Sequence, residues 1–223
     1  MGLAHSPSIV TNGLVLCLDA ANRKSYPGSG TTWTDLSLNK HNGTLQNGPT
    51  FNAGNQGYIS FDGVDDAIET VETKLSISNS LSLCAFVYHN SVGVGNAQRY
   101  VTIPSEIAVI RFQNYGTNQL AFYVKTLGTF RNVTVNNTIN ANTWYYIVGT
   151  WDGTTQLLYK NAELVGTNTP PAGTLNTLDG TYIVSSNGEG INGRIAVAKV
   201  YNRALSANEV LQNYNALKGR FGL

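Results

Sequence analysis

Charge is scarce in this sequence. Only 12% of the 223 residues are charged, roughly half of the ~25% that is usual in globular domains. Fourteen Lys and Arg oppose thirteen Asp and Glu for a net charge of +1, and no basic stripe is evident. Because nucleic-acid binding depends on clustered cations that neutralise phosphates, we expect no nucleic-acid partner. The 12 Tyr, 7 Phe and 3 Trp argue equally against a disordered chain.

Cysteine is also scarce. Cys17 and Cys84 each lie inside a short apolar run, and no CxxC pair with metal-ligand spacing occurs. This context favours two buried free thiols, which behave as small hydrophobes. A disulfide between them remains the alternative and requires that their strands be neighbours.

Long hydrophobic segments are missing. No run reaches 18 apolar residues, so the sequence predicts neither a membrane span nor membrane insertion. Residues 1–10 lack a charged and an apolar signal region, and we interpret them as a polar N-terminal arm rather than a signal peptide. The remainder, residues 11–223, is predicted to form a single domain.

Asn, Thr and Gly take the place of charge, with 26, 23 and 23 residues respectively. Thr favours strands, and Gly and Asn accept the positive φ of tight turns. Strand-like segments recur about every 8–12 residues, the strongest at 81–88, 144–151 and 194–201. The regular alternation of strands and helices that is typical of a parallel sheet does not occur in the sequence. The pattern therefore predicts an all-β sandwich of antiparallel strands.

One helix is predicted near the C-terminus. Ser206 and Glu209 have the spacing of a capping box, and Leu205 and Val210 have that of a hydrophobic staple. Gly219 is placed to end the helix. The apolar stripe would consist of Val210, Leu211, Tyr214 and Leu217.

Four segments, in this order and spacing, resemble the laminin G-like branch of the concanavalin A-like lectin/glucanase superfamily. They read ISFDGVDD (59–66), SLSLCAFVY (80–88), TWYYIVGTWDG (143–153) and NGRIAVAKVYNRALSANEV (192–210). The resemblance implies a two-sheet antiparallel jelly roll. Residues 8–51, with Asn12-Gly13-Leu14-Val15 and Trp33, are similar to the opening of such domains in bacteriophage structural proteins.

Three positions depart from the family pattern. The hairpin that usually turns on Asn-Gly has Asn161-Ala162, and because Ala adopts positive φ less readily than Gly, we expect a longer or differently shaped loop. Phe86 stands where Trp is common. Ala67 stands where an aromatic residue often follows the paired aspartates, which counts against a sugar platform there.

Catalytic patterns are absent from the sequence. Glycosidases of this superfamily carry Glu-x-Asp-x-x-Glu on one strand, so that the two carboxyls of the reaction face one cleft. Glu-x-Asp occurs nowhere in this chain, and neither does the Gly-x-Ser-x-Gly of a nucleophile elbow. The sequence therefore predicts a protein that is not an enzyme.

Four aromatic residues are candidates for sugar binding, because they stand in loop-like contexts where a ring could stack on a sugar. They are Tyr26, Trp33, Tyr100 and Tyr115. The alternative places these rings in the core, as rings in sandwiches commonly are. Trp144 and Trp151, within one strong strand segment, are predicted to be core residues.

Asp62, Asp65 and Asp66 form a candidate calcium site in a Gly-containing turn. Ca²⁺ takes six to eight oxygen ligands, often from carboxylates grouped in this way. The alternative is that these aspartates only cap the turn through local hydrogen bonds. The sequence assigns no metal to this turn and predicts no cofactor.

The resemblance leads to two functional hypotheses of different class. The first is a non-enzymatic bacteriophage protein on the virion surface, of capsid-decoration or tail-fibre type, whose partners are virion proteins, sister copies or host-surface glycans. The alternative is a carbohydrate-binding module of a secreted bacterial protein that acts on glycans. A glycosidase or lyase is the third and least supported hypothesis.

Overall fold

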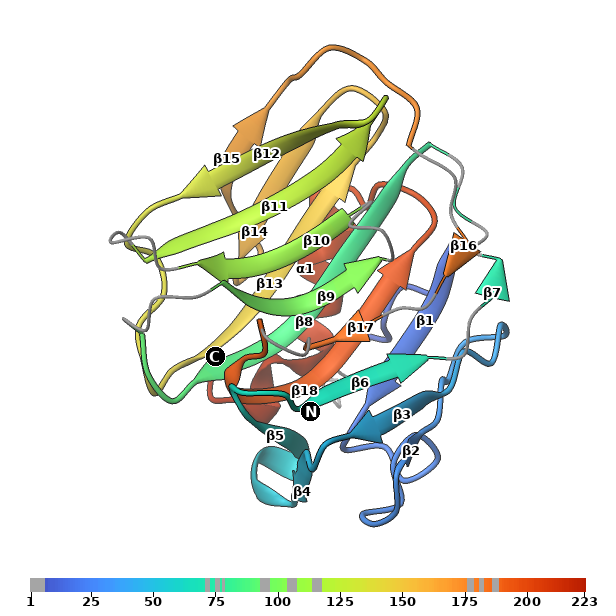
Figure 1. Cartoon of the computed structure of the whole chain (residues 1–223), viewed down its shortest axis with the longest axis vertical. Coiled ribbons are helices and arrows are strands. Elements are labelled where there is room, and N and C mark those ends of the chain that lie inside the picture. Colours follow the sequence, from blue (N-terminus) through green and yellow to red (C-terminus); the bar gives the residue numbers. More distant parts are fainter. Residues whose placement is uncertain are drawn as a thin grey trace, which may run out of the picture.

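Two antiparallel sheets packed face to face make up the body of the molecule (Figure 1). The computed structural model describes residues 7–70, 73–74, 77, 79–92, 97–103, 108–113, 118–175, 179–180, 183–185 and 189–223. Every strand pairing in these residues is antiparallel, as the all-β prediction requires.

Sheet A has eight strands in the order β15-β14-β13-β8-β18-β5-β4, with β1 paired to the second half of β18. Its strands are β1 (Leu14–Asp19), β4 (Thr50–Asn52), β5 (Tyr58–Asp62), β8 (Leu81–His89), β13 (Trp144–Trp151), β14 (Gln156–Lys160), β15 (Glu163–Asn168) and β18 (Asn192–Tyr201).

Sheet B also has eight strands, in the order β12-β11-β10-β9-β17-β6-β3-β2. They are β2 (Thr32–Trp33), β3 (Gly43–Gln46), β6 (Ala67–Thr70), β9 (Gln98–Ile103), β10 (Ala108–Gln113), β11 (Gln119–Thr126), β12 (Thr129–Val135) and β17 (Ile183–Val184). The short strands β7 (Thr73–Lys74) and β16 (Asp179–Gly180) pair separately.

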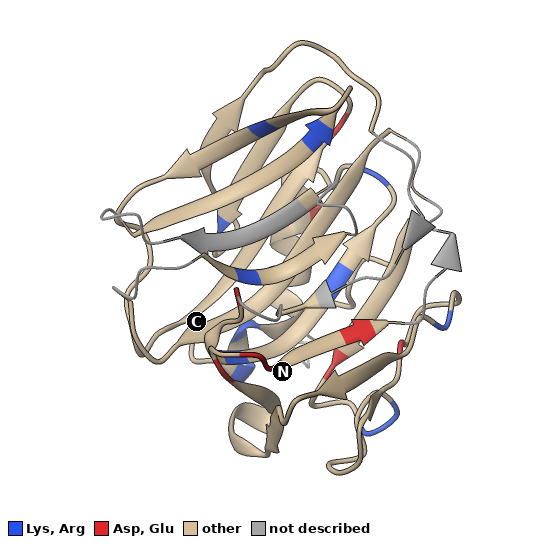
Figure 2. Ribbon diagram, in the orientation of Figure 1, with Lys and Arg blue, Asp and Glu red and all other residues tan. Residues whose placement is uncertain are grey.

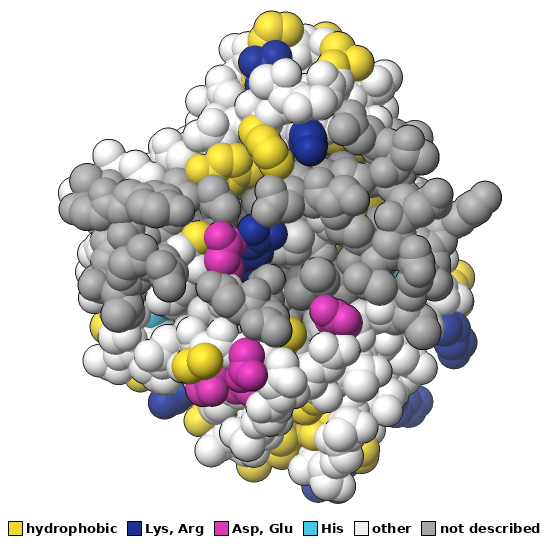
Figure 3. Space-filling view, viewed as in Figure 1, with side chains coloured by type: hydrophobic (Ala, Val, Ile, Leu, Met, Phe, Trp, Pro, Cys, Tyr) yellow, Lys and Arg dark blue, Asp and Glu magenta, His cyan; other side chains and the backbone are white. Residues whose placement is uncertain are grey.

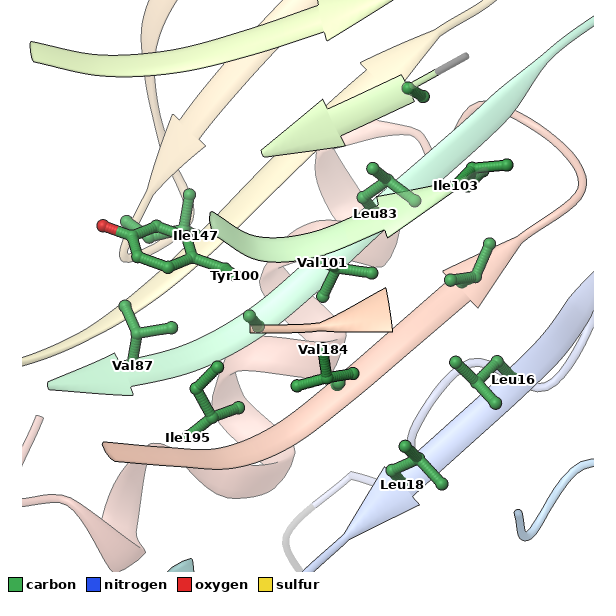
Figure 4. Packing of buried hydrophobic residues seen from close by; sticks show 14 of the residues in the cluster. Leu16, Leu18, Leu83, Val87, Tyr100, Val101, Ile103, Ile147, Val184 and Ile195 are labelled. Carbon is green, nitrogen blue, oxygen red and sulfur yellow. The ribbon is translucent and has the colours of Figure 1, made fainter. Parts of the chain in front are cut away.

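Sheet A is covered on both faces. One face packs on sheet B through the main hydrophobic core, in which Leu83, Ile147 and Ile195 lie close to Val101 and Val184 of sheet B (Figure 4). The other face packs under helix α1 (Ala207–Leu217), which lies behind the sheet in Figure 1. Strands buried on both sides need no polar alternation, which explains the continuous apolar runs of β8, β13 and β18.

Lys199 is an exception among these buried strands. It lies on β18 directly opposite Cys17 of β1 on one side and Cys84 of β8 on the other, and it is only 1% exposed. Both cysteines are free and buried. Because β18 runs between their strands, the structure does not support the disulfide alternative.

The capping box of α1 is confirmed. The Ser206 hydroxyl accepts a hydrogen bond from the Glu209 backbone N–H, and the Glu209 carboxylate accepts one from the Ser206 N–H. Arg203 donates to both carboxylate oxygens of Glu209, at 2.8 and 2.6 Å, and holds the pKa of this carboxyl down at about 2.

Two details of the predicted helix are wrong. Leu211 is exposed, and Asn213 takes a buried place, because its amide donates to the Tyr201 hydroxyl and accepts from the Val10 backbone N–H. The helix ends at Leu217 and continues as a 3-10 turn, Lys218–Arg220, so Gly219 is not its C-cap.

The end of the predicted arm packs against α1. Val10 is buried, and its carbonyl accepts a hydrogen bond from the Tyr201 hydroxyl at 2.9 Å. The carbonyl of Ser8 accepts one from the Gln212 amide at 2.7 Å. Among the described residues no helix is long and apolar enough to cross a membrane.

The hairpin between β14 and β15 is tighter than expected. Lys160 pairs with Glu163, so Asn161 and Ala162 alone form the turn. Both have positive φ, at 52° and 67°. The expectation of a longer loop is therefore wrong, because the strand register holds Ala162 in a left-handed conformation that Gly would adopt more readily.

Candidate functional site

The predicted sugar-binding rings do not form an exposed platform. Trp33 and Tyr100 are fully buried in the main core, and the Tyr100 hydroxyl is hydrogen-bonded to His89 Nε2 at 2.8 Å. Burial lowers the pKa of that histidine to about 4, so it is neutral at physiological pH. Tyr115 lies outside the described residues. Trp144 and Trp151 are buried, as predicted.

Tyr26 is also buried, but it lies beside a surface hollow. Its hydroxyl donates to the Gly30 carbonyl at 2.6 Å, and its ring centroid is 5.3 Å from that of Phe51 on β4. Phe51 is half-buried, and the two rings line a hollow of about 140 Å³ together with Arg23 and Pro27. Tyr26 was expected to be an exposed sugar-binding ring, and this expectation is wrong. Its ring is buried and forms part of the wall of this hollow.

A larger open groove of about 500 Å³ adjoins the hollow, and Ala21 and Gln56 line both. Three segments that are far apart in sequence meet there: the end of β1 with the residues after it, the 3-10 turn Gly54–Gln56, and the last residues of α1 with the chain that follows. The lining residues are Asp19, Ala21, Asn22, Gln56, Ala216, Leu217, Gly219 and Arg220.

An ion pair joins two of these segments. Arg220 Nη1 lies 2.9 Å from Asp19 Oδ1, and Arg220 Nη2 donates to the Gly57 carbonyl at 3.2 Å. The Arg220 carbonyl in turn accepts a hydrogen bond from the Asn55 amide at 3.0 Å. Because these contacts connect the three segments, the groove has a preformed shape.

The groove presents the groups that a polyhydroxylated ligand requires. The side chains of Asn22 and Gln56 are exposed, and an amide both donates and accepts hydrogen bonds. Leu217 and Ala216 supply an apolar wall, and the half-buried Phe51 ring stands in the adjoining hollow. Such a mixture of apolar lining and a few polar groups is typical of small-molecule sites.

The three aspartates of the predicted calcium site do come together. One carboxylate oxygen from each of Asp62, Asp65 and Asp66 lies within 4.8 Å of the others, and acidic side chains gather near the β5–β6 turn in Figure 3. The turn-capping contacts are present as well. Asp62 Oδ1 accepts from the Val64 N–H, and Asp66 Oδ2 accepts from the Asp62 N–H. Burial raises the pKa of Asp66.

The sequence comparison identifies the family. Residues 61–211, more than half of the chain, match the family described as the concanavalin A-like lectin/glucanases superfamily. The chain belongs to this superfamily. No curated protein matches the sequence at a significant level.

Solved structures share the fold of this superfamily member. The binding domain of Paraclostridial Mosquitocidal Protein 1 aligns with a TM-score of 0.73 and 16% identity over 92% of this chain and 52% of that one. The binding domain of botulinum neurotoxin DC in complex with SialylT aligns with a TM-score of 0.69 and 13% identity, over 93% of this chain and 52% of that one. The ligand-binding domain of botulinum neurotoxin serotype D in complex with N-acetylneuraminic acid aligns with a TM-score of 0.65 and 13% identity, over 92% of this chain and 51% of that one.

The chain therefore spans about half the length of the toxin binding domains that it resembles. At these identities the likeness shows the fold alone. Because it covers 92% of the chain, it reaches into the residues before position 61, where the family match begins.

Sequence reasoning missed the groove. Its polar residues come from positions 19–22, 56 and 220, which carry no shared motif. Asn22 and Gln56 look like ordinary loop residues in a chain with many amides. The one available signal was Tyr26, which was selected for its loop-like context and lies next to the groove.

Proposed function

We propose that this chain is a non-enzymatic carbohydrate-binding module and that it holds its glycan in the groove between β1, the Gly54–Gln56 turn and the chain after α1. The observation that supports this proposal most strongly is that exposed amides line a preformed groove and that a half-buried aromatic ring lines the adjoining hollow. Sugar hydroxyls need such hydrogen-bonding groups, and the C–H face of a pyranose packs on apolar side chains.

The comparisons support this proposal at the level of class. The superfamily is named for lectins and glucanases, and the similar structures are toxin binding domains, one of them in complex with SialylT and one with N-acetylneuraminic acid. The absence of Glu-x-Asp from the sequence favours binding over hydrolysis.

An acidic sugar is the ligand we propose to test first. Arg23 is exposed and lines the hollow beside Phe51, where its guanidinium could pair with the carboxylate of a sialic acid in bidentate fashion. The groove amides would then bind the remaining hydroxyls.

The test is a glycan array, followed by calorimetric titration with the best ligand and three variants. Gln56→Ala removes a groove amide, and Arg23→Gln removes the cation of the hollow. Asn208→Ala is the matched control, because Asn208 is exposed on the first turn of α1, about 12 Å along the helix axis from Ala216.

We expect each of the two site variants to weaken binding roughly tenfold, as the loss of one good hydrogen bond to a charged or polar ligand would do. The control should bind as the wild type does. The proposal fails if no glycan binds, or if the groove variants and the control bind equally well.

The virion hypothesis remains a prediction from residues 8–51. The structures described above are toxin binding domains rather than virion proteins, and no contact in the described part of the chain favours a coat-protein partner. We therefore place the carbohydrate-binding module first.

A further inference from the structure

The hairpin between β11 and β12 turns on an unusual pair of residues. Thr126 pairs with Thr129, so Leu127 and Gly128 alone form the turn, with φ of 49° and 78°. Two-residue turns of this kind favour Asn-Gly, because the first position also needs positive φ. A leucine there carries a left-handed backbone strain that Asn would largely avoid.

The same leucine is held out in solvent. Leu127 is 74% exposed, and Phe130, three residues further on, is 43% exposed. Neither side chain belongs to either hydrophobic core. Folding therefore gains little from Leu127 or Phe130. A strained and exposed apolar side chain at a hairpin tip is the kind of outlier from which a binding role can be inferred.

Two cations flank this tip. Lys125 pairs with Phe130 across the hairpin, and its Nζ lies 5.0 Å from the centre of the phenyl ring. Arg131 follows on β12 opposite the buried Val124, so its side chain lies on the other face of the hairpin from Phe130 and is half-buried. No acidic residue occurs between positions 119 and 135. Figure 2 shows both cations on these two strands, and in Figure 3 basic and hydrophobic side chains gather at the same end of the molecule.

An acidic turn that contains Asp152 is attached to this tip. The segment after β15 connects it to the tip, since Leu127 N–H donates to the Thr174 carbonyl and Gly173 N–H to the Gly153 carbonyl. In that turn the Asp152 carboxylate accepts hydrogen bonds from the Thr154 and Thr155 backbone N–H groups. These hydrogen bonds hold the pKa of Asp152 below its usual value, so its carboxylate stays charged, and the hairpin (+2) and this turn (−1) together carry +1.

The geometry points to a membrane-docking tip: we propose that Leu127 and Phe130 enter the interface of an anionic lipid bilayer while Lys125, on the same face as Phe130, contacts the lipid phosphates. Apolar side chains at the acyl boundary with cations at headgroup level are the arrangement that peripheral membrane contacts use. The contact is interfacial and differs from a membrane span, but it departs from the expectation from the sequence that no part of the chain inserts into a membrane.

A bilayer suits this surface better than a protein partner does. A specific protein interface buries on the order of 1,000 Å² or more and needs complementary shape, whereas two exposed apolar side chains on a narrow hairpin offer far less. A bilayer needs no matching contour, and its anionic headgroups complement Lys125. The proposal is independent of the carbohydrate site, which lies on other segments.

The test is co-sedimentation with vesicles of phosphatidylcholine and phosphatidylserine, which carry no glycan. The deciding variant is Leu127→Asn, and its matched control is Leu164→Asn, a leucine on the edge strand β15 that is 53% exposed. Lys125→Gln tests the cation. Urea unfolding of every variant is measured alongside.

We expect wild-type protein to bind these vesicles, and binding to fall with added salt and on vesicles of phosphatidylcholine alone. Leu127→Asn should lose roughly tenfold in binding, from the burial of one leucine side chain, while its urea midpoint rises because Asn tolerates the turn. A purely structural role for Leu127 would not produce these opposite changes. The control should keep wild-type binding.

The proposal is overturned if wild-type protein does not sediment with anionic vesicles, or if Leu127→Asn and Leu164→Asn bind equally well. Glycan binding is measured in separate experiments without lipid, so failure of the membrane proposal and failure of the carbohydrate proposal give distinguishable results.

Discussion

Arg220 and Asp19 form an ion pair of 2.9 Å between residues 201 positions apart in sequence. The Arg220 side chain is nine-tenths buried, and its Nη2 also donates to the Gly57 carbonyl. This contact attaches the end of the chain to the first strand and shapes the floor of the groove. Its removal is therefore expected to matter more than the removal of an ordinary surface ion pair.

Arg220→Met should lower the free energy of unfolding by about 1–3 kcal/mol, because Asp19 and the Gly57 carbonyl lose their charged donor. Urea unfolding monitored by tryptophan fluorescence measures this change. Arg23→Met is the control, since Arg23 is exposed and should change stability by no more than about 0.5 kcal/mol. Equal effects of the two substitutions would contradict a structural role for the ion pair.

Asp66→Asn should stabilise the protein at neutral pH. Asp66 is buried beside two other carboxylates, and its raised pKa means that the folded state favours the protonated form. That contribution to stability is present below the unfolded pKa and is lost as pH rises through the raised folded pKa. The melting temperature of the wild type should therefore fall between acidic and neutral pH by more than that of the Asn variant. Identical pH profiles of the two proteins would refute the prediction.

Calcium should act at the same place if these aspartates bind it. We expect Ca²⁺ to raise the melting temperature of the wild type, because it binds only the folded cluster and offsets the carboxylate repulsion. The increase should be smaller in Asp66→Asn and absent with Na⁺ at equal ionic strength. No change with Ca²⁺ would leave turn capping, through the contacts of Asp62 and Asp66, as the role of the cluster.

Ala162→Gly should stabilise the β14–β15 hairpin by about 1 kcal/mol, because Gly relieves the positive φ of 67°. Chemical unfolding gives the difference directly. The matched control is Ala216→Gly inside α1, which should destabilise by a similar amount because Gly is a poor helix former. If both substitutions destabilise, Ala162 is not strained.

Lys199→Met should also raise stability. The ammonium group is buried and has no hydrogen-bond partner in the described residues, and an unsatisfied buried polar group costs about 1–3 kcal/mol. Met retains most of the side-chain volume beside Cys17 and Cys84. Lys24→Met, at an exposed position, serves as the control and should leave the urea midpoint unchanged. A lower midpoint for Lys199→Met would indicate that the ammonium is solvated or paired.

Local sequence signals predicted local structure well. Ser206 and Glu209 marked the start of the helix, because a capping box depends only on residues three apart. The apolar runs of β8 and β13 marked buried strands. The signals were weaker where the packing of another element decides which residues are buried. Leu211 is exposed, whereas Asn213 is buried because it forms hydrogen bonds with Val10 and Tyr201.

The sequence by itself determined the fold class of this protein, an antiparallel β-sandwich with one capped helix. Strand periodicity and turn residues indicate this class because they act over only a few residues. Only the tertiary structure decided which aromatic rings are buried, that β18 separates Cys17 from Cys84, and that Asp19, Gln56 and Arg220 share one groove. The reason is physical, because those relationships depend on which distant strands pair and which faces pack, and no local pattern encodes them.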